Sequence, residues 1–168
     1  MIPALTSDRL DLRAWQMEDF AAYADFYTDP QSTRYIGGPQ NLTDVWQGFC
    51  SMAGQWLIRG VGVFAIEERT SQRLAGYAGL WFPVDIQEPE LCWGLFKDFH
   101  GKGYATEAAL AVQRWAHSTL GLPPLMSFTH PDNTASQKVA LRLGAHQTET
   151  TQLRGGPRLV FRHVIPAT

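Results

Sequence analysis

Two different spacings of hydrophobic residues follow one another along this chain. Residues 9–15 (RLDLRAW) alternate polar and apolar side chains, which is the pattern of a half-buried strand. In residues 17–28, by contrast, Phe20, Tyr23 and Tyr27 lie three and four positions apart, as on one face of an amphipathic helix. Gly, Pro, Asn and Asp stand at the breaks between segments, where they favour turns. The chain is therefore predicted to contain both strands and helices.

The same reasoning divides the whole chain into short segments. The expected strands are Arg9–Trp15, Val61–Glu68, Leu74–Phe82, Glu90–Phe96, Leu125–His130, Gln147–Leu153 and Arg158–Ile165. The expected helices are Met17–Thr28, a segment capped by Thr43 or Asp44 that ends near Arg59, Tyr104–Leu120 and Asn133–Leu143. A polar turn at 70–72 predicts a hairpin, and Gly155-Gly156-Pro157 is expected to hinge the last two strands. This order indicates a mixed α/β fold.

Segment 104–120 has the clearest helical pattern. Its small side chains at positions 105, 108, 109, 112 and 116 form one stripe, which allows the helix to lie close against a sheet. A helix of about 17 residues is long enough to connect two parallel strands. The strands before and after it are therefore expected to run parallel.

Composition narrows the class of protein without choosing a function. With 168 residues, 45% hydrophobic and 18% charged, the chain is expected to form one globular domain over residues 1–168. A formal net charge of −2 argues against a nucleic-acid-binding protein, whose contact face is basic. The first residues lack the pattern of a secretory signal, and no window has the ~18 apolar residues of a membrane span. We therefore expect a cytoplasmic protein without a membrane partner.

The two cysteines give no sign of a metal site. Cys50 and Cys92 lie in apolar stretches, and neither belongs to a CxxC pair or a Cys/His cluster. The histidines likewise lack the spacing of metal ligands. Two buried free thiols in a reducing compartment, and no bound metal, are the expectation.

The most informative segment is the Gly-rich turn at His100-Gly101-Lys102-Gly103-Tyr104-Ala105. It connects a predicted strand to a predicted helix, and its two glycines permit positive φ and leave the backbone accessible. The free N–H groups at the start of the helix would then face a bound anion such as a phosphate. The turn is not a dinucleotide fingerprint, because Thr106 stands where GxGxxG needs Gly, nor a P-loop, because no GK[ST] follows. An ordinary strand-to-helix turn is the alternative.

Four motifs in sequence order resemble the GNAT superfamily of N-acetyltransferases. Residues 100–108 resemble its motif A, Gln/Arg-x-x-Gly-x-Gly/Ala, and the string GKGYATEA is typical of the branch similar to ribosomal-protein N-terminal acetyltransferases (RimJ/RimL-like). Residues 133–136 (NTAS) with 143–145 (LGA) resemble the N-x-x-S…L-G-F signature of that branch. Residues 9–13 are similar to its opening strand, and residues 74–80 to its third strand.

This resemblance, over roughly residues 8 to 165, implies a fold and an activity. The fold is a central, mostly antiparallel sheet, splayed between the strands at 90–96 and 125–130 and flanked by helices. The activity is transfer of an acyl group, most often acetyl, from acyl-CoA to an amine, with acetyl-CoA or CoA as cosubstrate and no metal. The implied cofactor-binding residues are Leu95, Phe96, His100, Gly101, Lys102, Gly103, Tyr104, Ala105, Thr106, Asn133 and Ser136.

The chain departs from the family pattern at three positions. His100 replaces the Gln or Arg that usually begins motif A. That position contacts phosphate largely through its backbone, so binding is expected to persist with a smaller side-chain contribution. Ala140 stands where many members carry a Tyr that protonates the departing thiolate, so that role must pass to another group or to water. Ala145 in place of Phe is a smaller change in packing.

The resemblance also suggests catalytic residues, each with a plainer alternative. Glu90, at the start of the strand that leads to the turn, is the candidate base that takes the proton of the amine; a solvated carboxylate at a strand end is the alternative. Ser136 is the candidate donor to the leaving sulfur and Asn133 a candidate contact of the pantetheine, unless both only begin a helix. His130 is a candidate second base, and Lys102 either reaches a phosphate or is solvated.

The acceptor is expected to be an amine, either a small molecule or a protein N-terminus, and the protein a monomer or a homodimer. Five aromatic residues are candidates for either the acceptor pocket or the core: Trp46, Trp56, Trp81, Phe82 and Trp93. Two rival functions use the same fold. One is transfer of a longer acyl group, and the other is a non-catalytic acyl-CoA-binding sensor or interaction module.

Overall fold

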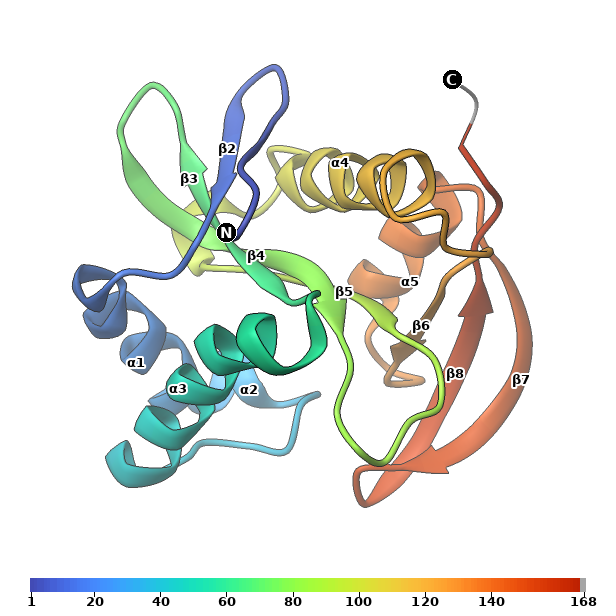
Figure 1. The fold of residues 1–168 in the computed structure, drawn as a ribbon. Coiled ribbons are helices and arrows are strands. Elements are labelled where there is room, and N and C mark those ends of the chain that lie inside the picture. Colours follow the sequence, from blue (N-terminus) through green and yellow to red (C-terminus); the bar gives the residue numbers. More distant parts are fainter. Residues whose placement is uncertain (167–168) are drawn as a thin grey trace.

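A sheet of eight strands forms the centre of the molecule, with helices on both of its faces (Figure 1). The strands follow the order β1-β2-β3-β4-β5-β6-β8-β7 across the sheet. The structure is a computed structural model that describes residues 1–166. The last two residues of the expected domain, 1–168, lie outside the described residues.

The order of elements is the mixed one that the sequence predicts. The strands are β1 (Leu5–Thr6), β2 (Leu10–Arg13), β3 (Val63–Glu68), β4 (Arg73–Trp81), β5 (Glu90–Leu95), β6 (Met126–Thr129), β7 (His146–Leu153) and β8 (Gly156–Arg162). The α-helices are α1 (Phe20–Thr28), α2 (Pro30–Thr33), α3 (Leu42–Arg59), α4 (Tyr104–Ser118) and α5 (Thr134–Arg142), and 3-10 helices lie at Met17–Asp19 and Lys97–Phe99. The predicted α/β class is confirmed.

The pairing of β5 with β6 differs from the rest of the sheet. These two strands run parallel, whereas all other neighbours are antiparallel. Helix α4 forms the crossover between them, as predicted from its length. The two strands pair at a single position, Glu90 with Met126. Beyond it they diverge, so the predicted splay of the sheet is confirmed.

Different helices cover the two faces of the sheet (Figure 1). On one face, Ala108 of α4 belongs to the same buried cluster as Phe64 of β3. On the other face, Phe49 of α3 belongs to a cluster with Val63 and Tyr77. Residues 63 and 64 are neighbours on β3 and point to opposite faces, as the alternation of a strand requires. The apolar positions of the central strands are therefore buried on both sides.

The start of α3 differs from the prediction. The helix begins at Leu42, and its cap is Asn41, whose side chain accepts a hydrogen bond from the backbone N–H of Asp44. The predicted cap, Thr43 or Asp44, was therefore wrong by two or three positions. Asp44 instead lies in the first turn, where its carboxylate is favoured by the helix dipole.

Other differences concern short elements and turns. Strand β1 and helix α2 were not predicted, because they have two and four residues and are too short to show a period. The turn between the last two strands is made by Arg154 and Gly155, both with positive φ (54° and 78°). The next two residues of the predicted hinge, Gly156 and Pro157, already belong to β8.

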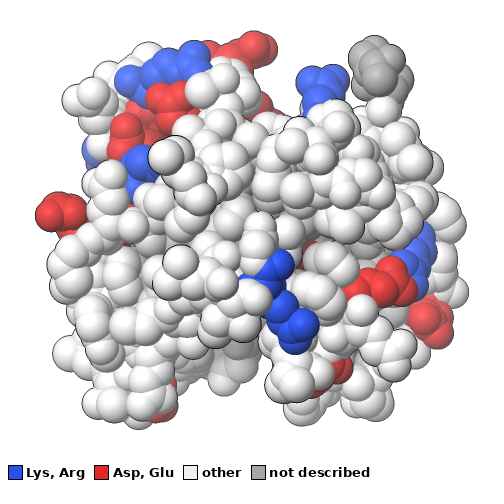
Figure 2. Space-filling model, in the orientation of Figure 1, with Lys and Arg blue, Asp and Glu red and all other residues white. Residues whose placement is uncertain are grey.

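Charged residues of both signs are scattered over the surface. On the face shown in Figure 2, the described Lys and Arg residues form small separate groups among Asp and Glu. Among the described residues, no helix has the length and apolar character needed to cross a membrane.

Candidate active site

Two cavities meet where β5 and β6 diverge. The larger cavity, of about 880 Å³, lies along β5, the loop before α4 and the start of α5. The smaller cavity, of about 360 Å³, is bounded by α1, β5, β6 and the β7–β8 hairpin. The residues that line both are Tyr35, Ile36, Tyr77, Trp93, Asn133 and Ser136. A molecule bound in one cavity can therefore reach a molecule bound in the other.

The Gly-rich turn forms one end of the larger cavity. Gly101 and Gly103 both have positive φ (76° and 82°), and Gly103 is the residue that precedes the first turn of α4. Glycine adopts this conformation without strain, whereas a side chain makes it costly. The turn therefore presents the first N–H groups of a 15-residue helix at the rim of the cavity, where they can bind an anion.

Three side chains of the turn make hydrogen bonds that hold it in place. His100 Nε2 lies 2.8 Å from the carbonyl oxygen of Leu95, to which it donates. Lys102 Nζ lies 3.4 Å from a carboxylate oxygen of Glu68, and the Tyr104 hydroxyl donates to the same oxygen. Hydrogen bonds from Ser71, Tyr104 and Lys102 lower the pKa of Glu68 to about 2, so this anchor stays ionised.

Most of the predicted cofactor-binding residues line the larger cavity. These nine of the eleven are Leu95, His100, Gly101, Lys102, Gly103, Ala105, Thr106, Asn133 and Ser136. The other two do not line it. Phe96 packs against Phe26 with ring centroids 5.4 Å apart, and Tyr104 is buried at 6% exposure beneath the turn.

Every second residue of β5 points its backbone N–H and carbonyl groups toward the larger cavity. The N–H of Phe96 donates to the carbonyl of Ala75 on the neighbouring strand. Because N–H directions alternate along a strand, the N–H groups of Leu95 and Trp93 point the other way, toward the opening beside β6. The carbonyl of Leu95 is already bonded to His100. The polar groups of Trp93 and the N–H of Leu95 are thus available to an extended ligand.

Asn133 and Ser136 lie at the junction of the two cavities. The side chain of Asn133 caps α5 by accepting a hydrogen bond from the backbone N–H of Ser136, at 3.1 Å. Asn133 is therefore the N-cap of α5, as the alternative interpretation expected. Since both residues also line both cavities, the cap places the Ser136 hydroxyl next to the point where they join.

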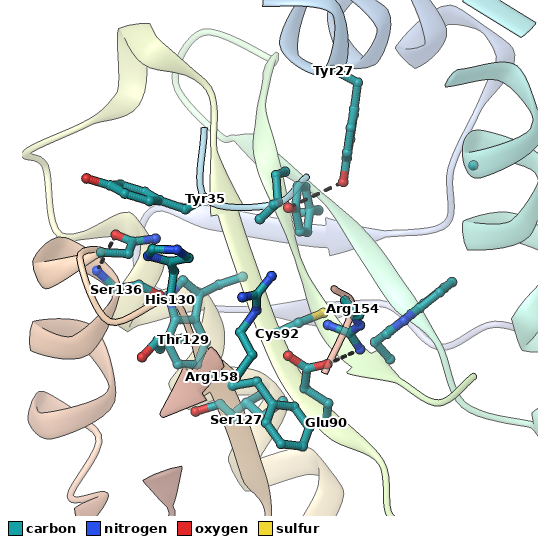
Figure 3. A pocket seen from close by; sticks show the side chains of 18 of the residues that line it. Tyr27, Tyr35, Glu90, Cys92, Ser127, Thr129, His130, Ser136, Arg154 and Arg158 are labelled. Atoms are coloured by element: carbon teal, nitrogen blue, oxygen red, sulfur yellow. Dashed lines mark hydrogen bonds and ion pairs between the residues drawn. The ribbon is translucent and has the colours of Figure 1, made fainter. Parts of the chain in front are cut away.

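Glu90 lies in the wall of the smaller cavity, as Figure 3 shows. It is only 4% exposed, so it is not the solvated strand-end carboxylate of the plainer alternative. Its Oε2 accepts a hydrogen bond from Arg154 Nη2 at 2.7 Å. Burial raises the pKa of Glu90, and the charge of Arg154 opposes that rise. A carboxyl with a raised pKa is suited to exchanging protons closer to neutral pH.

His130 also lines the smaller cavity and stacks on Tyr35, with ring centroids 5.3 Å apart. Its Nδ1 accepts a hydrogen bond from the backbone N–H of Asp132, at 3.1 Å. The neutral ring therefore carries its proton on Nε2. In that form the free nitrogen is a donor, which makes His130 a weaker candidate base than Glu90.

Ala140 is fully buried in a cluster with Ala145 and Phe161. It lines neither cavity, so it contributes no group to the candidate active site. Cys92, which lines the smaller cavity, has a pKa raised by burial, so its thiol is not a reactive nucleophile.

Several residues that line the cavities were not predicted from the sequence. Tyr35 and Tyr77 line both, and Arg154 and Arg158 line the smaller one. Of the five aromatic candidates, Trp81 and Trp93 line the smaller cavity, and Trp56 is a core residue. No group of three or more His, Cys, Asp or Glu residues within 1–166 could hold a metal ion.

A family model described as "Acetyltransferase (GNAT) domain" matches residues 9–146. The chain belongs to the GNAT acetyltransferase family. The resemblance stated from motif A is therefore confirmed, and the matched region contains the Gly-rich turn, β5 and the start of α5.

Individual relatives agree with this assignment. The protein is similar to an acetyltransferase from Agrobacterium tumefaciens strain C58, with 36% identity, a TM-score of 0.90 and coverage of 98% of this chain and 95% of that one. The uncharacterized N-acetyltransferase p20 of Bacillus licheniformis is 28% identical, over 80% of this chain and 78% of its own. RimL, a ribosomal L7/L12 α-N-protein acetyltransferase solved with coenzyme A, shares the fold (TM-score 0.80, 16% identity, 97% and 98% coverage).

Proposed function

We propose that this acetyltransferase transfers an acetyl group from acetyl-CoA to a primary amine, by direct attack of the amine on the thioester in a ternary complex. The observation that supports this proposal is the meeting of two cavities at the splay between β5 and β6. One cavity has the Gly-rich turn at its end, whose free N–H groups can bind an anion, and the other has a buried carboxylate in its wall.

In this proposal CoA occupies the larger cavity. Its pyrophosphate binds the N–H groups of residues 101–106, and the pantetheine extends along the opening of β5 past Leu95 and Trp93. This path leads from the turn to the shared residues Asn133 and Ser136. The thioester then lies at the junction, where the N–H groups of β5 can polarise its carbonyl as charge develops on the oxygen.

The amine enters through the smaller cavity. Glu90 takes a proton from the ammonium group, directly or through water, and the neutral amine attacks the carbonyl carbon. Ser136 donates a hydrogen bond to the sulfur as the carbon–sulfur bond breaks, and the nitrogen passes its extra proton to the departing thiolate, directly or through water. Holding both molecules in adjoining cavities supplies a large share of the rate, because the reaction no longer depends on their chance encounter.

The experiment combines binding with turnover. CoA and acetyl-CoA are titrated by calorimetry, and thiol release from acetyl-CoA is followed over a panel of amines that includes amino acids, polyamines and short peptides. We expect binding of both nucleotides and thiol release that depends on the amine. Binding without thiol release for any amine would instead support a sensor or interaction module. Faster release from longer acyl-CoA would favour transfer of a longer acyl group.

A further inference from the structure

Arg158 is a buried cation whose side chain reaches into the smaller cavity. It lies on β8 and is only 8% exposed. In Figure 3 its guanidinium extends between His130 and the Glu90–Arg154 pair. One of its nitrogens, Nη1, donates to the carbonyl of Pro157 at 2.8 Å. A guanidinium has five N–H donors, so several remain for a ligand.

Arg158 forms no ion pair with a carboxylate of the described residues. Within residues 1–166, the other two arginines of the hairpin have partners: Arg154 pairs with Glu90 at 2.7 Å, and Arg162 with Glu88 at 2.6 Å. Glu90 is close enough for its charge to act on Arg158, but its carboxylate is already paired with Arg154. Burial and the neighbouring Arg154 both lower the pKa of Arg158.

A buried charge is costly unless an opposite charge and hydrogen bonds compensate it. Two like charges next to each other increase that cost. We propose that the acceptor is an amine that also carries a carboxylate, and that Arg158 binds this carboxylate. The inference rests on the proposed function, since it names the substrate class of the same reaction.

The shape of the guanidinium and the size of the smaller cavity both suit a small acceptor molecule that carries a carboxylate. A planar guanidinium matches the two oxygens of a carboxylate. Among the described residues that line this cavity, Arg158 is the one arginine without an ion pair. A volume of about 360 Å³ accommodates an amino acid or the first residues of a peptide. The wall includes Tyr27, Tyr77 and Trp81, which suit the apolar part of such a molecule.

Two kinds of acceptor carry both an amine and a nearby carboxylate. In a free amino acid it is the α-carboxylate, and in a peptide it is an Asp or Glu side chain near the N-terminus. The test therefore compares each amino acid with its neutral amide, and an acidic peptide with its Asn or Gln counterpart. The steady-state kcat/KM for each acceptor is measured with saturating acetyl-CoA.

The decisive variant is Arg158→Gln, with Arg162→Gln as the matched control on the same strand. For the carboxylate-bearing acceptor, we expect Arg158→Gln to lower kcat/KM by about 10- to 100-fold, mainly through KM. The KM for acetyl-CoA and the rates with neutral amides should change by less than about threefold. Arg162 lines neither cavity, so its variant should behave as wild type. Comparing the acid-to-amide ratio of Arg158→Gln with that of wild type cancels any difference in amine basicity between the two acceptors.

The outcomes separate this inference from the proposed function. Equal losses for acids and amides, or no loss for either, would overturn the role of Arg158 while leaving the acetyltransferase intact. If no amine supports thiol release, the proposed function fails, and thermal stabilisation by the same carboxylates still tests the site. Stabilisation of wild type but not of Arg158→Gln would support carboxylate binding; equal stabilisation would refute it.

Discussion

At the scale of single residues, Gly103 has a backbone conformation in the candidate cofactor site that few residues other than glycine adopt. Its φ of +82° places it in the left-handed region, and a Cβ built there would meet only Arg9 Nη2, at 3.6 Å. Space is therefore not what excludes a side chain in the free protein. The constraint is the backbone conformation, which a β-branched residue adopts only with strain.

We expect Gly103→Val to lower the affinity for CoA by at least about 100-fold, because the turn must change φ and its N–H groups then leave the phosphate. Calorimetric titration with CoA measures this change. The control is Gly60→Val at the C-cap of α3, where φ is +71° and a Cβ would meet nothing within 4 Å. That variant should lose similar stability and keep its CoA affinity. Equal affinity in both folded variants would place the pyrophosphate elsewhere.

Glu90 allows a test of proton transfer. We expect Glu90→Gln to lower kcat/KM for the amine at neutral pH by 10²–10⁴-fold, the range that a general base typically contributes. The amide can still accept the hydrogen bond from Arg154, so acetyl-CoA should bind as before. Raising the pH should restore part of the rate, because more of the amine is then neutral.

The pH profile distinguishes this role from a structural one. Burial raises the pKa of Glu90, so the wild-type rate should begin to fall at a higher pH than for an ordinary glutamate as the solution is acidified. Glu90→Gln should lack this limb. A loss below about tenfold, with an unchanged profile, would assign Glu90 to the support of Arg154 alone.

The parts of the site that could be predicted from the sequence are those whose residues lie close together along the chain. The Gly-rich turn is a continuous segment whose glycines and helix start carry the signal, so its residues could be named in advance. Arg158 and Tyr35 come from distant parts of the chain and show no periodic or motif pattern. Only the β6–β8 pairing and the position of α2 bring them together, and neither is encoded locally.

At the scale of elements, the close packing of β4 and β5 depends on glycine. Gly94 pairs with Tyr77, and a Cβ on Gly94 would lie 2.4 Å from the Tyr77 ring. The ring, which lines both cavities, therefore lies directly against the backbone of β5. Trp93 and Leu95, the residues on either side of Gly94, direct their backbone N–H groups to the opening beside β6.

We expect Gly94→Ala to destabilise the protein by about 1–3 kcal/mol, as overpacking of a filled site usually does, and to weaken CoA binding because Tyr77 is displaced. Urea denaturation and CoA titration measure the two effects. Gly54→Ala in α3 is the control, since a Cβ there meets nothing within 4 Å. It should stabilise the helix by about 0.5–1 kcal/mol. Full stability of Gly94→Ala would mean that Tyr77 moves aside freely.

The elements that the sequence predicted are those with at least one full period of pattern. The strand at 73–81 and the helix at 104–118 were found within two residues of their observed ends, because buried faces repeat along them. The cap of α3 was missed because Asn41, Thr43 and Asp44 are all common capping residues. The choice among them depends on where the chain arrives from α2, which no local pattern records.

At the scale of the whole molecule, Glu68 connects the sheet to the Gly-rich turn. Its carboxylate accepts from Ser71 on one side and from Tyr104 and Lys102 on the other. The bonds to Ser71 and Tyr104 are the main reason that its pKa falls to about 2. A carboxyl with a lowered pKa stabilises the folded state above its ordinary pKa, and this contribution disappears as the pH falls toward the lowered value.

We therefore expect Glu68→Gln to lower the melting temperature at pH 7 and to approach wild type as the pH falls from about 5 toward 2. The measurement is a series of thermal melts of both proteins across that range. Arg73–Asp98 is an exposed pair, with side chains 61% and 64% accessible, and Asp98→Asn serves as the control with little effect. A constant difference between Glu68→Gln and wild type at every pH would contradict the assignment.

The single bridge between Glu90 and Met126 has a consequence for local dynamics. Beyond it, β5 has no paired strand on that side within the described residues, although it lies in the middle of the sheet. The amides of Trp93 and Leu95 should therefore exchange with deuterated solvent faster than those of Gly94 and Phe96, which face β4. Bound CoA would take the position of the missing neighbour strand. When CoA is bound, the two sets of amides should exchange at similar rates, so the rate of deuterium uptake at Trp93 and Leu95 would report whether the larger cavity is occupied.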